Sequence, residues 1–199
     1  MLNKKTTFQR ARGDINVKIK NNEINRFYQS GSAKVFYPKS SQKFKELVLV
    51  NTAGGITSGD NFSYDFEIVN KSKIFLTTQT AERAYKGFNE KAKIKISLTI
   101  DDTSNLFWIP QELILFNNCN FDRNIEVNLN PNSNFLLAET TIFGRTAMGE
   151  YLEKGYFNDN WRINVNKNLF HAEALNLNGD IKETLSNIAS AKDGIAISN

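Results

Sequence analysis

Histidine and cysteine, the side chains that most often hold metals or carry nucleophilic catalysis, each occur once in this chain. His171 and Cys119 cannot form a zinc site of four Cys and His ligands, and one thiol cannot close an intramolecular disulfide. A serine triad would have to use His171 as its base. His171 lies in the alternating segment 169–173, which favours a structural role, and Cys119 lies between two asparagines without the surroundings of a nucleophile.

A glycine-rich loop follows the apolar run at residues 47–50. Gly54 and Gly59 have the spacing of a phosphate-cradling loop, but Asp60 stands where such loops carry lysine, and its carboxylate would repel phosphate. The loop therefore does not predict a nucleotide site. Gly54 and Gly55 are instead expected to adopt positive φ in a sharp turn, or to let another backbone approach closely.

Carboxylates provide the remaining candidates for acid–base or metal chemistry. Residues 106–116 are the most apolar stretch of the chain, and Gln111 and Glu112 interrupt it. Glu112 is either exposed on a loop after Pro110 or partly buried with a partner, and the second case would indicate a functional site. Glu139 occupies a similar position at the end of the apolar segment 135–137.

Gly144 and Gly149 bracket Arg145 and precede Glu150. This spacing predicts a tight loop held by a bond between the Arg145 guanidinium and a carboxylate, for which arginine has the bidentate geometry. Capture of an anionic group on a partner is the alternative role for Arg145.

Composition excludes several broad classes of protein. The length of 199 residues predicts a single domain over residues 1–199, and 40% hydrophobic content with 15 Phe is enough for a core. Lys and Arg number 25 against 21 Asp and Glu, a net charge of +4. Because the cations are interleaved with acids and not clustered, even a pI near 9.1 does not predict nucleic-acid binding.

The chain is expected to be a cytoplasmic protein. Its first fourteen residues are charged but lack the apolar core of a signal peptide. No apolar run approaches the roughly 18 residues needed to cross a bilayer.

Alternation of apolar and polar residues dominates the pattern of the chain. Residues 64–68, 94–98 and 125–129 each predict a strand with one apolar face. The continuous apolar run at residues 47–50 predicts a strand covered on both faces. Helices are expected only at residues 81–87, where Thr77 and Thr78 could provide the N-terminal cap, and at residues 181–191.

Three segments repeat one pattern: the end of an alternating strand, a polar turn with serine, and an apolar triplet. They span residues 68–76, 100–108 and 129–137, with serines at 72, 104 and 133, and residues 161–171 form a looser fourth copy. Repeats of this length predict an all-β fold of stacked β-hairpins in a β-helix-like or solenoid body. A simple meander, which also repeats hairpins, is the alternative.

Polar residues follow each apolar triplet at a similar distance. Gln79, Gln111 and Glu139 lie seven, seven and six residues after the three serines. If the repeats stack, these side chains form a row, which could line a channel or form an ordinary polar rim. The sequence favours the rim.

Taken in order, four motifs resemble those of the urease accessory protein UreD family, also called UreH. They are residues 51–56 with Gly59 and Asp60; residues 77–79 with Ala81 and Tyr85; residues 108–112 with Ile114 and Phe116; and Gly144 and Arg145 with Gly149 and Glu150. The resemblance covers residues 12–171. It marks a set of candidate partner-binding or motif residues: Asn51, Gly54, Gly55, Gly59, Thr78, Gln79, Trp108, Gln111, Gly144, Arg145 and Gly149.

The resemblance implies a β-helical, non-enzymatic maturation factor with no tightly bound cofactor. Such proteins bind UreF, recruit the GTPase UreG through it and dock on apo-urease as a hetero-oligomer, for which a dimer of UreD–UreF heterodimers is one form. Nucleic acid and membrane are not expected as partners. Nickel is delivered to the urease active site, in one description through an internal tunnel.

Transit of nickel requires weak oxygen ligands and no fixed site, because nickel binds more firmly to the nitrogen and sulfur donors that this chain almost lacks. Asp60, Glu112, Glu139 and Glu150 are the carboxylates expected near such a path.

Family members usually continue into a further C-terminal segment, whereas this chain stops at Asn199 after a polar tail. The sequence is therefore expected to lack that segment, either as a natural short version or as an incomplete record. The alternative function is that of a β-helical carbohydrate-active enzyme with a carboxylate pair drawn from Glu112, Glu139 and Glu150. Such enzymes are usually secreted, which counts against this alternative.

Overall fold

The alternating segments form the longest strands of the protein, which together make sheet A. The computed structural model describes residues 9–39, 41–88 and 90–199. In spatial order, sheet A consists of β16 (Asn168–Asp180), β15 (Lys154–Val165), β11 (Asn120–Leu129), β8 (Ala92–Ile100), β5 (Asn61–Val69), β1 (Arg12–Lys20) and β2 (Glu23–Gly31). The predicted strands at 64–68, 94–98 and 125–129 lie within β5, β8 and β11 and are confirmed.

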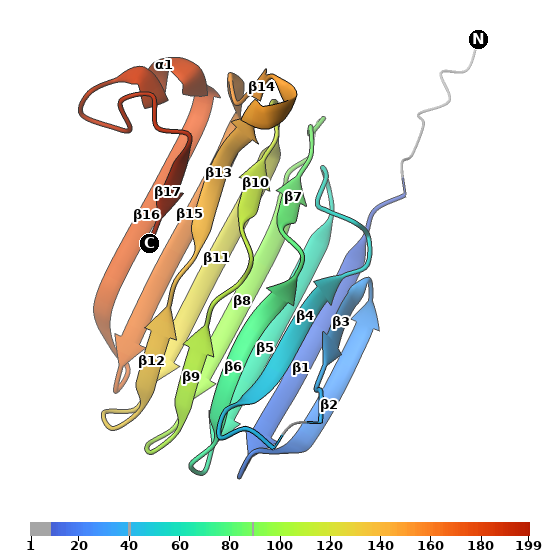
Figure 1. Ribbon diagram of the computed structural model, residues 1–199, viewed down its shortest axis with the longest axis vertical. Helices are drawn as coiled ribbons and strands as arrows, with labels where there is room; N and C mark the ends of the chain where they lie inside the picture. Colours follow the sequence, from blue (N-terminus) through green and yellow to red (C-terminus); the bar gives the residue numbers. More distant parts are fainter. Residues whose placement is uncertain (1–8, 40, 89) are drawn as a thin grey trace.

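Two shorter sheets lie end to end with each other and together cover one face of sheet A, so that the molecule has two layers (Figure 1). Sheet B consists of β12 (Asn134–Leu137), β9 (Asn105–Trp108), β6 (Lys73–Gln79), β4 (Lys45–Asn51) and β3 (Ala33–Phe36). Sheet C consists of β14 (Glu150–Tyr151), β13 (Thr140–Arg145), β10 (Leu113–Leu115) and β7 (Glu82–Ala84), and β17 (Ala196–Ser198) pairs with β13.

The chain winds through these sheets as a solenoid. Each of three coils passes from sheet A to sheet B and then to sheet C: β5–β6–β7, β8–β9–β10 and β11–β12–β13. Equivalent strands of successive coils pair in parallel, as β5 does with β8 and β8 with β11. The predicted all-β solenoid is confirmed, and a meander is excluded. The two arms of each repeat, however, pair with the next coil and not with each other as in a hairpin.

The repeated serines close the turns between sheets A and B. The Ser72 hydroxyl donates to the Val69 carbonyl at 2.5 Å, and the Ser133 hydroxyl donates to the Asn130 carbonyl at 2.7 Å. The Ser104 hydroxyl donates to the Asp101 carboxylate at 2.5 Å. Ser72 and Ser104 are fully buried, so each hydroxyl supplies a partner to a turn that water does not reach.

The prediction that residues 161–171 form a fourth copy of the repeat is wrong. Residues 161–171 belong to β15 and β16, which pair antiparallel within sheet A. Asn166 and Lys167 join them with positive φ of 49° and 66°, as a two-residue hairpin turn requires. This hairpin carries sheet A beyond β12, the edge strand of sheet B.

The helix expected at residues 81–87, with Thr77 and Thr78 as its cap, does not form. Strand β7 occupies this segment, because its backbone groups are bonded from both sides. The Arg83 carbonyl accepts the Ile56 N–H at 2.7 Å, and the Glu82 N–H donates to the Glu112 carbonyl at 2.8 Å. Tertiary pairing here prevails over a local pattern that also suits a helix.

Two further expectations hold in part. The C-terminal helix α1 covers only Ile181–Ser186, where the Asp180 carboxylate caps it by accepting the Glu183 N–H at 3.0 Å. The apolar run at residues 47–50 lies in β4 as a strand, but only Leu47 and Leu49 are buried. Sheet B is therefore covered on one face and not on both.

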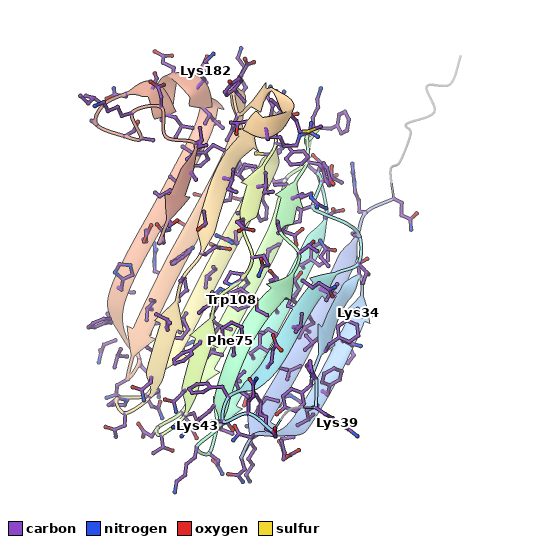
Figure 2. All side chains as sticks on the ribbon, viewed as in Figure 1. Lys34, Lys39, Lys43, Phe75, Trp108 and Lys182 are labelled. Carbon is purple, nitrogen blue, oxygen red and sulfur yellow. The ribbon has the colours of Figure 1, made fainter. Side chains whose placement is uncertain are left out.

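Aromatic side chains fill the space between the layers. Phe62, Phe66, Phe121, Phe157 and Trp108 are each almost completely buried. Trp108 is labelled in the middle of the view in Figure 2, whereas the labelled lysines lie toward the margins and ends of the molecule. Within the described residues no helix is long and apolar enough to cross a membrane.

Candidate functional site

Polar residues gather where the chain passes from sheet B to sheet C, at a position that we call the B–C corner. It comprises Asn51, Thr78–Glu82, Pro110–Glu112 and Ala138–Thr140. Hydrogen bonds tie successive coils together there. The Gln111 N–H donates to the Thr78 hydroxyl at 2.9 Å, and the Glu82 N–H donates to the Glu112 carbonyl at 2.8 Å. Residues from three of the four sequence motifs thus lie along one line.

The row expected from the serine spacing holds for two of its three members. Gln79 and Gln111 are exposed and form a polar rim, whereas Glu139 is buried. Leu137 pairs with Trp108, so Glu139 falls opposite Pro110 and one position short of Gln111. Because side chains alternate along a strand, a spacing of six in place of seven turns Glu139 to the other face.

Glu139 contacts a buried arginine that is not among the residues predicted from the sequence. Arg123, on β11, donates to both oxygens of Glu139 at 2.7 and 2.6 Å. It also donates to both oxygens of Asp159, on β15, at 2.9 and 2.6 Å. The Trp161 indole N–H completes the cluster by donating to Asp159 at 2.9 Å. Arg123, Glu139, Asp159 and Trp161, which we call the buried cluster, join sheet A to the B–C corner.

The buried cluster is acidic overall. One guanidinium faces two carboxylates, a formal charge of +1 − 2 = −1, with all three side chains 5% exposed. Burial by itself lowers the pKa of Arg123, but the carboxylates of Glu139 and Asp159 hold it well above its ordinary value. Arg123 is therefore charged at neutral pH, with the two carboxylates beside it.

Glu82 adds a second acidic position at the same corner. The Asn51 amide nitrogen lies 3.3 Å from both Glu82 oxygens. Burial raises the pKa of Glu82 to about 7, although the hydrogen bond from Asn51 opposes the shift. Glu82 and Asn51 line a cavity of about 40 Å³, together with Tyr64. The Glu82 carboxyl therefore changes its charge near neutral pH.

A shallow pocket of about 290 Å³ opens beside the buried cluster. Gln111 and Glu112 line it, and so does Glu139. Glu112 is exposed, whereas the oxygens of Glu139 are bound from inside by Arg123. The pocket thus joins the solvent to the outer side of the cluster, with one carboxylate at its exposed part and another at its buried part.

The glycine-rich loop beside this corner has the structural role expected of it. Gly54 and Gly55 have positive φ of 81° and 144°. A Cβ atom on Gly55 would lie 2.3 Å from the Tyr85 ring and 2.8 Å from the Arg83 carbonyl oxygen. Asp60 closes the loop, since its two oxygens accept the Ala11 and Thr57 N–H groups, each at 2.8 Å.

The Arg145 loop also follows its prediction. Arg145 forms an ion pair with Glu150, and Gly149 ends the short 3₁₀ turn Thr146–Met148 in a left-handed conformation. The guanidinium also lies over the Phe116 ring, 4.3 Å from its centre. The Arg145 side chain is 42% exposed, so it remains accessible to a partner.

The four carboxylates expected near a metal path are dispersed. Asp60 and Glu150 lie in separate loops with partners of their own, whereas Glu112 and Glu139 line the same pocket. Among the residues that the structure describes, no group of three or more His, Cys, Asp or Glu could hold a metal ion.

His171, Cys119 and Trp108 lie outside the B–C corner. His171 is exposed on β16, with its Nε2 atom 3.7 Å from the Glu173 carboxylate. Cys119 is buried, and burial raises the pKa of its thiol to about 12, so little of the reactive thiolate forms near neutral pH. Trp108 is buried, and its indole N–H has no hydrogen-bond partner among the described residues.

Two of the three residues that the sequence motifs did not point to, Arg123 and Asp159, can be recognised from the alternation of inward and outward positions. Arg123 lies between Phe121 and Ile125 on the inward face of β11, and Asp159 lies between Phe157 and Trp161 on the inward face of β15. A charge at an inward position indicates a buried partner. Glu82 left no such trace, because its strand is only three residues long.

Comparison with known proteins agrees with the motifs. Residues 9–196 match the family model described as UreD urease accessory protein. The chain is 41% identical over 172 residues to a protein of Rhodopseudomonas palustris strain BisB5 named urease accessory protein UreD, covering 86% of this chain and 61% of that protein. A protein of the same name from Mesorhizobium japonicum is 37% identical over 174 residues, covering 87% and 62%. The chain therefore spans about 61% of the length of such curated relatives.

Proposed function

Because the chain belongs to the UreD urease accessory protein family, we propose that it serves urease maturation as a scaffold. In this role it binds UreF, recruits UreG through UreF, and docks on apo-urease so that nickel enters the urease active site. The observation that carries the proposal is the family match over residues 9–196. The rigid solenoid supports it, since parallel coils with long paired strands present fixed surfaces to several partners.

The names of the family and its relatives describe accessory proteins and not enzymes. The surroundings of Glu139 agree with this. A glycosidase carboxylate must be free to donate a proton or attack the sugar, but both oxygens of Glu139 accept hydrogen bonds from Arg123. A carbohydrate-active role that uses Glu139 is therefore not supported.

Nickel is the cargo in this proposal, and the B–C corner is the place where the chain would handle it. The pocket lined by Glu112 and Glu139 forms the mouth, and the buried cluster lies behind it. An excess of negative charge at the cluster favours a cation. Carboxylate oxygens bind nickel less firmly than imidazole or thiolate, so that the ion is passed on and not retained.

The four carboxylates expected from the sequence have unequal support in this role. Glu112 and Glu139 line the pocket that forms the mouth. Asp159 accepts from the same Arg123 behind that pocket, and Glu82 lines a separate cavity at the corner. Asp60 and Glu150 hold loops in shape, which suits the binding of partners better than contact with the ion.

Co-expression of the chain with urease, UreF and UreG tests both parts of the proposal. A tagged chain is expected to retain UreF on an affinity column, and absence of any complex would contradict the scaffold role. In Arg123→Met combined with Glu139→Gln and Asp159→Asn, no buried ion is left unpaired, and we expect the UreF complex to persist while the nickel content of purified urease falls. Glu126→Gln, on the solvent face of β11, is the control and should leave the nickel content unchanged. Full nickel loading in the triple variant would contradict the path through the cluster.

A further inference from the structure

Asp60 does not oppose an anion at the glycine-rich loop in the way that its position in the sequence suggests. Its side chain is buried, and its two oxygens accept the Ala11 and Thr57 N–H groups, each at 2.8 Å. Hydrogen bonds from two backbone N–H groups offset part of the negative charge of this carboxylate. The same bonds hold the residue before β1 against the loop, and they thereby bring the neighbouring side chains of that segment beside it.

A pocket of about 570 Å³ lies between the glycine-rich loop and the start of β1. Arg10 and Arg12 line it, and among its described lining residues Asp60 is the one that is acidic. Two arginines therefore stand against one carboxylate, whose oxygens are already bonded. This balance of charge favours a negatively charged ligand. Three further residues with hydroxyl groups line the pocket: Ser32, Thr57 and Tyr85.

Arg12 carries a charge that no carboxylate of the described residues neutralises. Arg26, Arg123 and Arg145 each form an ion pair with a carboxylate. Arg12 forms none within residues 9–39, 41–88 and 90–199, and it is exposed. Arg10 has a contact of its own, but a guanidinium carries five N–H donors and can bind more than one partner. Both arginines can therefore donate to one ligand.

The backbone of the loop adds a donor at the same pocket. Gly55 lines the pocket and is buried, yet among the described residues its N–H donates to no acceptor. A buried N–H without a protein partner is rare, and beside a cavity it binds a ligand or water. Gly55 also borders the smaller cavity beside Glu82. The place of the ligand therefore follows from the two arginines, to which this N–H adds.

We propose that this pocket binds a phosphate group, either free phosphate or the phosphate of a small monoester. One guanidinium satisfies both oxygens of a carboxylate, whereas the three terminal oxygens of a phosphate monoester accept from two guanidinium groups and a backbone N–H together. The Tyr85 side chain, 39% exposed, provides an apolar surface for the organic part of an ester. The pocket is separate from the B–C corner, so this proposal and the role in urease maturation can fail independently.

Titration of the ¹⁵N-labelled full chain with inorganic phosphate and with phenyl phosphate, at neutral pH and constant ionic strength, tests the proposal. Saturable shifts of the Ser32, Gly55 and Thr57 amide signals are expected. Benzoate, which has the ring but a carboxylate in place of the phosphate, should bind more weakly by at least about fivefold. Tighter binding of phenyl phosphate than of inorganic phosphate supports an ester as the ligand, and equal binding supports free phosphate. Saturation by neither phosphate, or equal binding of benzoate, would overturn the proposal.

Arg12→Gln provides the second test. It removes the unpaired guanidinium but keeps the Arg12 carbonyl, which accepts the Ser32 N–H at 2.8 Å, so the fold should persist. Phosphate binding should weaken by more than about tenfold, because charge-assisted hydrogen bonds are lost. Lys20→Gln, at the other end of β1, removes the same charge far from the pocket and should leave the affinity within about twofold. Unchanged binding in Arg12→Gln, or an equal loss in both variants, would show that the phosphate binds elsewhere.

Glu90 allows a test with the opposite sign. A Cβ atom on Gly59 would lie 2.6 Å from the Glu90 Oε2 atom and 3.0 Å from the Arg10 Nε atom, so both side chains lie against Gly59. The Glu90 carboxylate therefore repels an anion bound beside Arg10. Because Glu90 is exposed and solvent screens its charge, Glu90→Gln should strengthen phosphate binding by only about two- to threefold. Weaker binding in Glu90→Gln would contradict an anion at this place.

Discussion

Arg123 and Glu139 face each other across the two layers of the protein, joined by hydrogen bonds of 2.7 and 2.6 Å. Arg123 belongs to sheet A and Glu139 lies at the B–C corner, so the pair fixes the distance between the layers inside the core. Asp159 holds the other side of the same guanidinium. A single side chain thus satisfies two buried carboxylates, which makes Arg123 the residue on which the corner depends most.

Removing Arg123 is expected to destabilise the fold strongly. In Arg123→Met, Glu139 and Asp159 remain buried without a counter-charge, and the free energy of unfolding should fall by roughly 3–5 kcal/mol. Urea unfolding followed by fluorescence measures the change. Lys18→Met is the control, because Lys18 pairs with Glu67 at the surface and should cost no more than about 1 kcal/mol.

Neutralising the whole cluster should recover much of that loss. Arg123→Met combined with Glu139→Gln and Asp159→Asn leaves no buried charge, so its unfolding free energy should exceed that of Arg123→Met by at least about 1 kcal/mol. If the triple variant is less stable than Arg123→Met, packing and hydrogen bonds within the cluster matter more than its charge. Urea unfolding under identical conditions makes the comparison.

The solenoid could be predicted from the sequence because each of its causes is local. Alternation at residues 64–68, 94–98 and 125–129 marks the strands of sheet A, and the serines at 72, 104 and 133 mark the turns that follow them. The local pattern at residues 81–87 wrongly predicts a helix, because the conformation of this segment depends on bonds to Ile56 and Glu112, which lie far away in the chain. Local patterns cannot report such partners.

The candidate site could be predicted only in part, for a related reason. Glu139 was identified, but its inward direction depends on a spacing one residue shorter than in the preceding coils. Arg123 and Asp159 carry the alternation signal of inward charges, yet their mutual contact joins residues separated by 36 positions. The contact follows from the parallel pairing of β11 with β15. The sequence does not show this pairing, because the fourth repeat differs in form from the first three.

Glu82 should make the stability of the protein depend on pH. Its folded pKa of about 7 lies above its ordinary value of 4.5, so the folded state binds more protons than the unfolded state between these values. The contribution of Glu82 to the free energy of unfolding is therefore fully present below about pH 4.5. It is lost as the pH rises through about 7. Since Glu82 keeps some exposure, the loss should be on the order of 2 kcal/mol.

Glu82→Gln tests this dependence directly. The variant should unfold at nearly the same urea concentration at pH 5.5 and pH 8, apart from changes that Glu112→Gln at the exposed rim shows as well. The native chain should require less urea at pH 8 than at pH 5.5. An equal pH dependence in the native chain and in Glu82→Gln would show that other groups cause it.

Gly55 and Gly54 should differ in their tolerance of a side chain. Gly55→Ala places a Cβ 2.3 Å from the Tyr85 ring and 2.8 Å from the Arg83 carbonyl oxygen, and the loss of stability should be roughly 2–4 kcal/mol. Gly54→Ala meets open space and has only its positive φ against it, which costs about 1 kcal/mol. Thermal unfolding of both variants gives the comparison, and equal melting temperatures would contradict the close approach of Tyr85.

The Cys119 thiol should be inert in the folded protein. Burial raises its pKa to about 12, so almost no thiolate forms at pH 8, and the sulfur atom is inaccessible as well. A disulfide reagent such as DTNB should leave the native chain unlabelled over hours and release one equivalent of chromophore in concentrated urea, where the thiol recovers a pKa of about 8.5. Cys119→Ser is the control and should release none. Rapid labelling without urea would show that the β11–β15 end of the solenoid opens far more often than its packing implies, because Cys119 lies directly against Gly155 at the start of β15.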